Sequence, residues 1–374
     1  MNDISTPAAI VDNAKMQANI KRMMDRMNKL GVSFRPHVKT AKSLPVTEAM
    51  LAAGAQGITV STLKEAELFF SAGIKDILYA VGMAATKLPM ALQLIQRGCD
   101  LKIITDNVES ARAIAAFGAA TKTTFKVLIE IDTDGHRSGI VPESGELFAV
   151  AAELNAPGAE LLGVMTHAGG SYACTEPDKL EAYAEQERAR CVLAAQRLRD
   201  AGYPSPVVSV GSTPTALSAN NLSGVNEVRA GVFVFFDLVM CNIGVCSMAE
   251  IALSVLTTVI GHQKEKSWAI VDAGWMAMSR DRGTANYTTD YGYGQVCDVE
   301  GNPIHGFTMI GANQEHGIIC STIDAQTDIA SRFPVGTRLR ILPNHACATC
   351  AQFPEMNALM PNGSVFKWSR FYGW

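Results

Sequence analysis

Apolar residues recur along the first two-thirds of the chain in short runs that alternate with stretches of helical periodicity. The runs lie at 33–39, 57–62, 76–81, 101–106, 125–132, 161–167, 207–212 and 227–236. Between them, segments such as 43–54 and 62–73 have helical spacing and end in glycine, as helices commonly do. Eight strand-then-helix units, roughly 20–45 residues apart, predict a (β/α)8 barrel. A doubly wound open sheet is the alternative, because strand counting cannot show closure.

The pattern changes after about residue 245. Helical periodicity fades, and short β-like runs appear at 268–274 and 337–343 with glycine and proline between them. The sequence therefore predicts two domains. A barrel over 12–245 is followed by a mostly β domain over 246–374, which also takes up residues 1–11.

Composition narrows the class of protein. Of the 374 residues, 48% are hydrophobic and 18% charged, and the net charge is −4. No overall positive field exists to hold nucleic acid or an anionic membrane, and no apolar run approaches the ~18 residues of a membrane span. The start lacks the order of a signal peptide, and the nine scattered cysteines suit reduced thiols. We expect a cytoplasmic protein with no nucleic-acid or membrane partner.

Three basic residues alternate at the end of the first run. Arg35, His37 and Lys39 share one face if this run is a strand. Lys39 would then lie at the strand's C-terminal end, where barrel active sites are built. Neighbouring cations would favour its free amine, which can form a Schiff base with a carbonyl. The alternative is a solvated basic loop end. Lys42 lies off this face and is expected to be a solvated residue at a helix start.

Two other strand ends carry residues that suit phosphate. The segment "GST" (211–213) follows the seventh run, and "RAG" (229–231) lies in the eighth. Barrels often bind phosphate in the loops after strands seven and eight. Glycine permits close backbone approach, and Ser212 and Thr213 add hydroxyl donors, although such a turn is weak evidence alone. Together with a Schiff-base lysine, this layout suits a cofactor with an aldehyde and a phosphate, namely pyridoxal phosphate.

Several motifs carry a resemblance to a known family. They include "RPHVKT" (35–40), "EIDTDGHRSG" (130–139), "VSVGSTPTAL" (208–217), "VRAGV" (228–232) and "LPNHACAT" (342–349). Over nearly its whole length the chain resembles the pyridoxal-phosphate enzymes of the alanine-racemase-like barrel fold. Within them it is similar to the branch that holds D-serine dehydratase, D-threonine aldolase and D-threo-3-hydroxyaspartate dehydratase.

The resemblance implies roles for particular residues. Lys39 would carry the cofactor, Arg137 would lie near its ring oxygen, and Arg229 would face its pyridine nitrogen. The remaining implied cofactor contacts are His167, Tyr172, Ser212, Thr213, Gly231 and Val232. Three alternatives stay open. The alternative for Arg137 is a surface residue in a glycine turn. The alternative for His167 is a structural hydrogen-bonded residue, and the alternative for Arg229 is a member of a structural ion pair.

A histidine and a cysteine stand two residues apart in "PNHACATC" (343–350). On an extended segment His345 and Cys347 would point the same way, and imidazole with thiolate suits Zn²⁺. Two protein ligands make an incomplete structural site, but a catalytic metal keeps positions open. The resemblance implies a divalent-metal site on this pair, holding Zn, Mn or Mg. Its cysteine favours dehydration, because aldolase relatives typically have aspartate there. Cys350 is expected to be a buried or idle thiol.

The resemblance implies a lyase that eliminates water from a β-hydroxy-D-amino acid. The expected substrate is D-threo-3-hydroxyaspartate, giving oxaloacetate and ammonia, with D-serine as a further candidate. A β-carboxylate would need a cation, and Arg280, Arg282 and His316 are candidates, although each could be an ordinary surface or structural residue. The rivals are a retro-aldol lyase and a non-catalytic pyridoxal-phosphate carrier. Racemisation needs a second base that the sequence does not identify. The expected assembly is a homodimer.

Overall fold

The computed structural model describes residues 3–374 and contains two compact units, which we treat separately. The barrel unit comprises Lys21–Gly231 with Phe371–Trp374, and the β unit comprises Met1–Ile20 with Val232–Arg370. Residues 1 and 2, which the sequence analysis assigned to the β-rich domain, lie outside the described residues. Helix α1 (Asn13–Leu30) crosses the division at Ile20.

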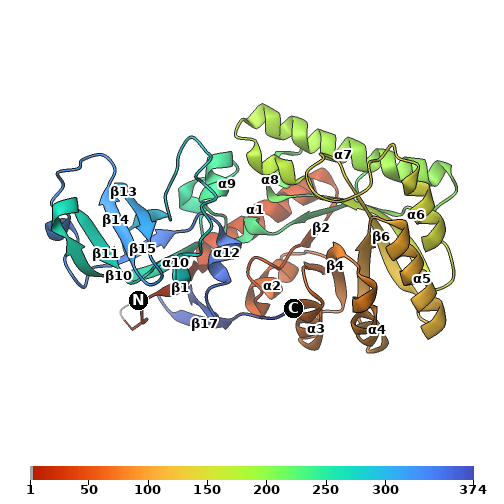
Figure 1. Ribbon diagram of the computed structural model, residues 1–374, viewed down its shortest axis with the longest axis horizontal. Helices are drawn as coiled ribbons and strands as arrows, with labels where there is room; N and C mark the ends of the chain where they lie inside the picture. The colour runs from red at the N-terminus through yellow and green to blue at the C-terminus, as the bar shows by residue number, and fades with distance from the viewer. Residues whose placement is uncertain (1–2) are drawn as a thin grey trace. The chain divides into compact units, whose positions relative to one another are not determined.

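Each of the eight predicted apolar runs overlaps a strand of one parallel sheet in the barrel unit (Figure 1). The strands are β2 (Ser33–Pro36), β3 (Ile58–Val60), β4 (Asp76–Gly82), β5 (Asp100–Thr105), β6 (Phe125–Ile131), β7 (Ala159–Thr166), β8 (Val207–Val210) and β9 (Glu227–Ala230). The sheet order is β2-β9-β8-β7-β6-β5-β4-β3, and a parallel bridge from His37 to Thr59 links its two ends. The predicted barrel is therefore confirmed as nearly closed, against the open-sheet alternative.

The helices of the barrel unit lie outside its strands (Figure 1). They are α2 (Leu44–Ala52), α3 (Leu63–Ser71), α4 (Leu88–Gln96), α5 (Val108–Thr121), α6 (Glu146–Leu154), α7 (Pro177–Asp200) and α8 (Thr213–Ser218). Side chains of Thr62 and Asn107 cap α3 and α5 by accepting backbone N–H groups at Glu65 and Ser110. These caps start the helices directly after β3 and β5.

Strand alternation divides the barrel interior into an apolar and an ionic part. Leu78, Ile104, Leu128 and Met165, from four neighbouring strands, form one buried cluster. Two residues before Leu78 on the same face of β4, Asp76 binds Arg35 of β2. Charged groups therefore occupy the amino ends of the strands, with apolar packing above them.

The β unit confirms the predicted mostly β C-terminal domain. Within the described residues six strands close on one another in the order β11-β14-β13-β12-β15-β10, because β10 also pairs with β11. They are β10 (Leu253–Gln263), β11 (Trp268–Val271), β12 (Gln295–Cys297), β13 (Pro303–Ala312), β14 (Gly317–Ser321) and β15 (Arg338–Leu342). The sheet continues from β10 through β1 (Ala8–Asp12), β16 (Glu355–Leu359) and β17 (Val365–Ser369).

Two predicted strands end earlier than expected. The run 33–39 is a strand only to Pro36, because the chain then turns and the Lys42 N–H donates to the Val38 carbonyl at 2.8 Å. The run 227–236 is a strand only to Ala230, and a 3-10 helix follows at Val232–Val234. A Cβ at Gly231 would lie 2.9 Å from the His37 carbonyl oxygen, so only glycine fits this turn without a shift.

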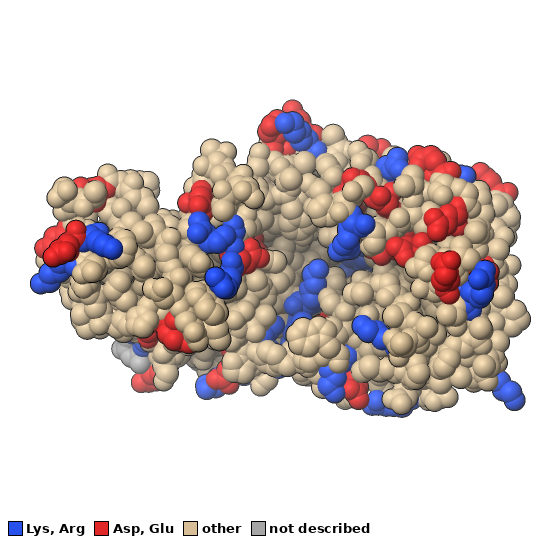
Figure 2. Space-filling view, viewed as in Figure 1, with Lys and Arg blue, Asp and Glu red and all other residues tan. Residues whose placement is uncertain are grey.

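Charged residues of both signs are interspersed over helices α5 to α7 on the face drawn in Figure 2. In the part of the chain that the structure describes, no helix combines the length and apolar character needed to cross a membrane. No disulfide joins the nine cysteines, all of which lie within residues 3–374.

Candidate active site

Lys39 lies in the turn that follows β2, at the carboxyl end of the barrel. Its neighbours Val38 and Thr40 are each 1% exposed, whereas Lys39 is exposed. The strand alternation that we used to place Lys39 therefore stops before it, but the turn still directs this one side chain outward. Because the strands are parallel, the loops after the other strands meet at the same end of the barrel.

His167, the residue after β7, lies among the predicted cations. Burial lowers its pKa to about 3, and a hydrogen bond to the Gly211 carbonyl opposes this change only in part. The charges of Lys39, Arg137 and Arg229 lower the pKa further. His167 Nδ1 lies 3.1 Å from the Gly211 oxygen, so Nδ1 carries the proton of a neutral ring. The structure thus brings four predicted site residues within electrostatic reach of one another.

His37 adds a second neutral imidazole to this group. Burial lowers its pKa well below 6.5, and Lys39, Arg229 and His167 lower it further. Among the described residues its Nδ1 is buried without a hydrogen-bond partner. A buried polar atom left in this way is expected to meet a ligand or a water.

Arg229 is 4% exposed. Its Nη1 donates to the Ser209 hydroxyl and its Nη2 to the Thr166 carbonyl. Burial lowers its pKa, and the Glu227 charge opposes that change. The guanidinium is therefore held by two neutral acceptors.

The loops after β7 and β8 are joined by hydroxyl groups. Ser212 caps α8 by accepting the Thr215 N–H at 3.2 Å, and its hydroxyl lies 3.0 Å from the Ser171 hydroxyl. Ser212 is 2% exposed and Thr213 is fully buried. The two hydroxyl residues proposed from sequence thus lie in an ordered loop at the carboxyl end of β8.

Glu187 of α7 orders both loops, and the sequence analysis did not identify it. Its Oε1 accepts the N–H of Ala168 at 3.0 Å and that of Gly211 at 3.1 Å. Burial raises the pKa of this carboxyl group, although both hydrogen bonds oppose the change. The available signal was its spacing, because Glu187 continues the buried stripe of α7 from Leu180 and Ala184.

The other predicted cofactor residues occupy the same end of the barrel or follow it in the chain. The ring centroids of Tyr172 and His167 are 6.2 Å apart. Arg137, in the loop after β6, pairs with Glu130 at 3.4 Å and keeps 58% of its side chain exposed. Gly231 ends the close turn after β9, and Val232 is the next residue, at the start of the 3-10 helix.

Lys42 corrects one expectation. It is not a solvated residue, because its Nζ lies 2.7 Å from Glu65 Oε1 and only 22% of its side chain is exposed. Glu65 is 2% exposed and also accepts the Ser61 N–H at 3.0 Å. Lys42 therefore neutralises a buried carboxylate at the start of α3, and this role is distinct from that of Lys39.

In the β unit, His345 and Cys347 lie at the start of α12 (Ala346–Cys350) and not on an extended segment. His345 is the residue before the helix, and the Cys347 side chain is within hydrogen-bonding reach of its imidazole. Cys347 is therefore helical and not extended as expected, yet the side chains of His345 and Cys347 still approach each other. Cys350 is fully buried beside the Met356 sulfur at 3.8 Å, as expected for a buried thiol.

Two carboxylates that the sequence analysis did not single out hold this pair. His345 Nδ1 lies 2.6 Å from Asp281 Oδ2, which leaves Nε2 as the ring nitrogen for a metal. Asp237 is 1% exposed and accepts the Ala346 N–H, between the two candidate ligands, at 2.9 Å. Burial opposes the charged imidazole, but Asp281 and Cys347 raise the pKa of His345 to about 11.

The three candidates for a β-carboxylate also lie in the β unit. Arg282 is paired with Asp290 at 2.8 Å, so its charge is already neutralised. Arg280 lies 5.0 Å from the Trp275 ring centroid and is exposed, as is His316. Of the two arginines, Arg280 is thus the better candidate for an incoming carboxylate.

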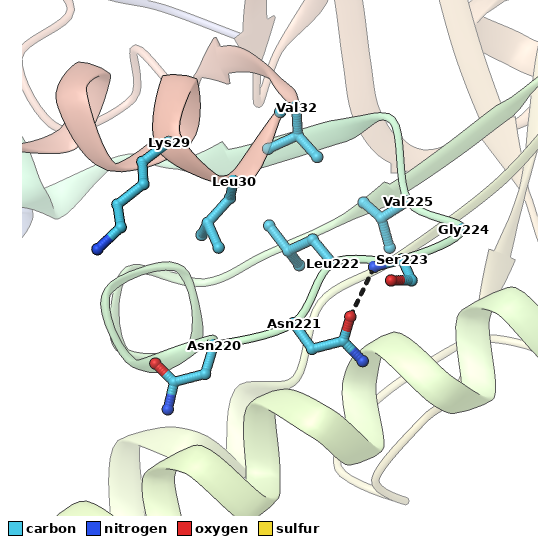
Figure 3. Close-up of a pocket in the computed structure, with 10 residues that line it drawn as sticks. Lys29, Leu30, Val32, Asn220, Asn221, Leu222, Ser223, Gly224 and Val225 are labelled. Carbon is cyan, nitrogen blue, oxygen red and sulfur yellow. Dashed lines mark hydrogen bonds between the residues drawn. The ribbon is translucent and has the colours of Figure 1, made fainter.

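A hollow of about 410 Å³ on the barrel unit lies away from these residues (Figure 3). It is formed by the segments that precede β2 and β9, including Lys29, Asn220 and Asn221. Within it Asn221 Oδ1 accepts the Ser223 N–H at 3.0 Å. None of the predicted site residues lines it, and it belongs to the amino ends of the strands.

The residues at the carboxyl end of the barrel fit pyridoxal phosphate. They supply an exposed amine, a buried guanidinium, an unpartnered imidazole nitrogen and a glycine turn without room for a side chain. In the β unit, His345 and Cys347 are the two candidate metal ligands. Within residues 3–374 no group of three or more His, Cys, Asp or Glu side chains is arranged to hold a metal.

Comparison with known families agrees with this geometry. The alanine racemase N-terminal domain matches residues 11–239, and the putative serine dehydratase domain matches residues 252–359. These two models between them cover all the candidate site residues.

Curated relatives and solved structures narrow the comparison. The chain is 63% identical to D-threo-3-hydroxyaspartate dehydratase of Delftia sp. (strain HT23), over 99% of this chain and 98% of that one. It is 30% identical to D-serine dehydratase of Dictyostelium discoideum, over 98% and 96%. A structure of a D-threo-3-hydroxyaspartate dehydratase mutant in the metal-free form matches with a TM-score of 0.99 and 62% identity, over 100% and 99% of the two chains.

Proposed function

Since this chain belongs to the alanine racemase family and carries the serine dehydratase domain of one of its branches, we propose that it is a pyridoxal-phosphate-dependent lyase acting on β-hydroxy-D-amino acids. The observation that carries the proposal is the grouping of Lys39, His167 and Arg229 at one end of the barrel. The high identity to a dehydratase over the whole chain favours elimination of water over aldol cleavage. It also disfavours the non-catalytic carrier.

The substrate we propose is D-threo-3-hydroxyaspartate, with D-serine as a second substrate. Loss of water from 3-hydroxyaspartate, followed by hydrolysis of the C–N bond, gives oxaloacetate and ammonia, so the water lost is regained. The preference rests on the relative from Delftia sp.. Exposed Arg280 is our candidate for the β-carboxylate.

Each barrel residue has a task that its position permits. Pyridoxal phosphate, held covalently by Lys39, supplies an electron sink for the Cα–H bond. The Lys39 amine would take the Cα proton. Arg229 would face the ring nitrogen and Arg137 the ring oxygen, and His167 and Tyr172 would contact the ring. Ser212, Thr213, Gly231 and Val232 would hold the phosphate.

The metal proposal concerns the β unit. A divalent cation, Zn, Mn or Mg, on His345 and Cys347 would act as a Lewis acid on the β-hydroxyl and make hydroxide a better leaving group. Asp281 orients the imidazole that would bind it. We further propose that residues 12–245 form the cofactor domain and that 246–374 with 1–11 form the metal domain.

A substrate panel tests the reaction. The protein is given 3-hydroxy-D-aspartate, D-serine and D-threonine, and ammonia, keto acid, glycine and aldehyde are measured. Keto acid with equal ammonia from the first two substrates is the expected result. Glycine with aldehyde as the main products would instead establish the retro-aldol reaction.

Chelation and the variant His345→Ala test the metal. Either should lower turnover by at least tenfold, equivalent to ~1.4 kcal/mol of lost transition-state stabilisation. The visible absorbance of the bound cofactor should remain, because the cofactor residues lie in the other predicted domain. Metal content, measured on the same samples, should fall in the variant. Full turnover in demonstrably metal-free protein would contradict the metal proposal.

A further inference from the structure

The buried guanidinium of Arg229 has no carboxylate as a direct hydrogen-bond partner in the described contacts. Its acceptors are the Ser209 hydroxyl and the Thr166 carbonyl. A fully buried cation is costly unless nearby groups compensate its charge. The charges of Glu227 and Glu187 act on Arg229 through space, and the two neutral acceptors are its hydrogen-bonded connections to the rest of the barrel.

Ser209 connects Arg229 to a carboxylate. Its side chain is completely buried, and its hydroxyl donates to Glu227 Oε1 at 2.6 Å. A hydroxyl has one hydrogen, so donation to Glu227 leaves the oxygen lone pairs to accept from Arg229. The two hydrogen bonds therefore have one direction, from guanidinium to hydroxyl to carboxylate.

Glu227 is also bound by a second arginine. Arg35 Nε donates to Glu227 Oε2 at 2.7 Å, and the other end of the same guanidinium binds Asp76 at 2.7 Å. Glu227 and Arg35 are 9% and 8% exposed. Burial opposes the Arg35 charge, but Glu227 and Asp76 together raise the pKa of this arginine above its ordinary value.

We propose that Ser209 and Glu227 are positioning residues for Arg229, which they hold in a fixed plane at the cofactor's ring nitrogen. The carboxylate fixes the hydroxyl, and the hydroxyl fixes the guanidinium. This inference rests on the proposed function, because it takes Arg229 to face that nitrogen. The proposal assigns neither Ser209 nor Glu227 a contact with the cofactor.

Glu227→Gln and Ser209→Ala test the relay. The first keeps the shape of the side chain and removes its charge, and the second removes the connecting hydroxyl. Asp76→Asn is the matched control, because it removes the other carboxylate on Arg35 without touching Ser209. Ser209→Thr is the conservative variant, because it keeps a hydroxyl at this position. Each protein is stripped of cofactor and titrated with pyridoxal phosphate, and its dissociation constant, visible spectrum and unfolding temperature are recorded.

Glu227→Gln and Ser209→Ala should weaken cofactor binding about tenfold, which corresponds to ~1.4 kcal/mol, and should shift the visible absorption maximum. Asp76→Asn should lower the unfolding temperature but leave the spectrum and affinity within about twofold of wild type, well below that tenfold step. Ser209→Thr should recover most of the affinity.

Two results would overturn the proposal. One is an Asp76→Asn protein whose spectrum changes as much as that of Glu227→Gln, since the effect would then be general loosening of the barrel. The other is a wild-type spectrum and affinity in both relay variants. If the wild-type protein binds the cofactor but forms no keto acid, the proposed reaction fails while this binding test still decides the relay.

Discussion

Two lysines three residues apart have opposite environments. Lys39 is exposed at the barrel's carboxyl end, and Lys42 pairs with Glu65, which is 2% exposed. A side chain that binds a cofactor and one that compensates a buried charge should respond differently to truncation. The contrast gives a test at the scale of single residues.

Lys39→Ala should abolish the visible absorbance of the bound cofactor and the turnover together, because we propose that the amine is both anchor and base. The unfolding temperature of the cofactor-free protein should change little. Lys42→Ala should keep the absorbance but lose roughly 1–3 kcal/mol of stability, because Glu65 is left uncompensated. Absorbance and thermal unfolding are measured on both proteins. The reverse pattern would show that the cofactor lysine is misassigned.

Helix starts are the feature to test at the scale of elements. The short helix α8 begins with a reciprocal capping box in which the Ser212 side chain and the Thr215 side chain each accept a backbone N–H. Ser247 and Glu250 form a second capping box at the 3-10 helix Met248–Glu250 in the β unit. Both boxes begin with a serine, but only Ser212 lies in the proposed phosphate loop.

Ser212→Ala and Ser247→Ala should each cost about 1 kcal/mol of stability, the usual contribution of an N-cap. Only Ser212→Ala should also weaken the binding of pyridoxal phosphate. Chemical denaturation and cofactor titration are run on both variants. Equal cofactor affinities in the two proteins would remove Ser212 from the phosphate site.

At the scale of the whole molecule, two neutral imidazoles inside the barrel unit predict sensitivity to acid. His167 has its pKa lowered from 6.5 to about 3, and burial also lowers that of His37 well below 6.5. Below pH 6.5 these two histidines become protonated in the unfolded chain but stay neutral in the native state. The free energy of unfolding should therefore fall as the pH drops from 6.5 toward about 3.

The loss should amount to about 1 kcal/mol per histidine and pH unit within that range. Thermal unfolding of the wild type and of His167→Gln, between about pH 7 and about pH 5, measures it. The variant should show a shallower decline, whereas His305→Gln, which alters an exposed residue, should match the wild type. The raised pKa of Glu187 acts in the opposite direction, so the comparison of variants isolates the imidazole. Equal slopes would contradict the prediction.

We also expect a two-fold symmetric homodimer, as the family resemblance implies. Light scattering at the concentrations used for assay should give twice the chain mass of 40.0 kDa. A monomer under these conditions would remove the dimer from the proposal.

The alternation of strands and helices was predictable from sequence, because the periodicity of apolar residues is local and is visible along each strand and helix. All eight barrel runs and the change to β structure were predictable in this way, whereas the near closure of the barrel was not. The motif resemblance supplied Lys39, His345 and Cys347 as candidate site residues. Exact strand ends at Pro36 and Ala230 were not predictable, because turns after them depend on contacts with other segments.

The pairing of charges could be seen only in the folded protein. Arg35 looked like part of a basic cluster with Lys39, but Glu227, 192 residues away, and Asp76 neutralise it. Glu187 and Asp281 likewise reach partners on other elements. A charge is compensated by the oppositely charged residues that barrel closure or β packing brings close to it. The spacing of residues along the chain does not show which residues these are. Of the four basic residues around the end of β2, Arg35 is therefore neutralised and His37 has a lowered pKa. Lys42 is paired with Glu65, and Lys39 is exposed.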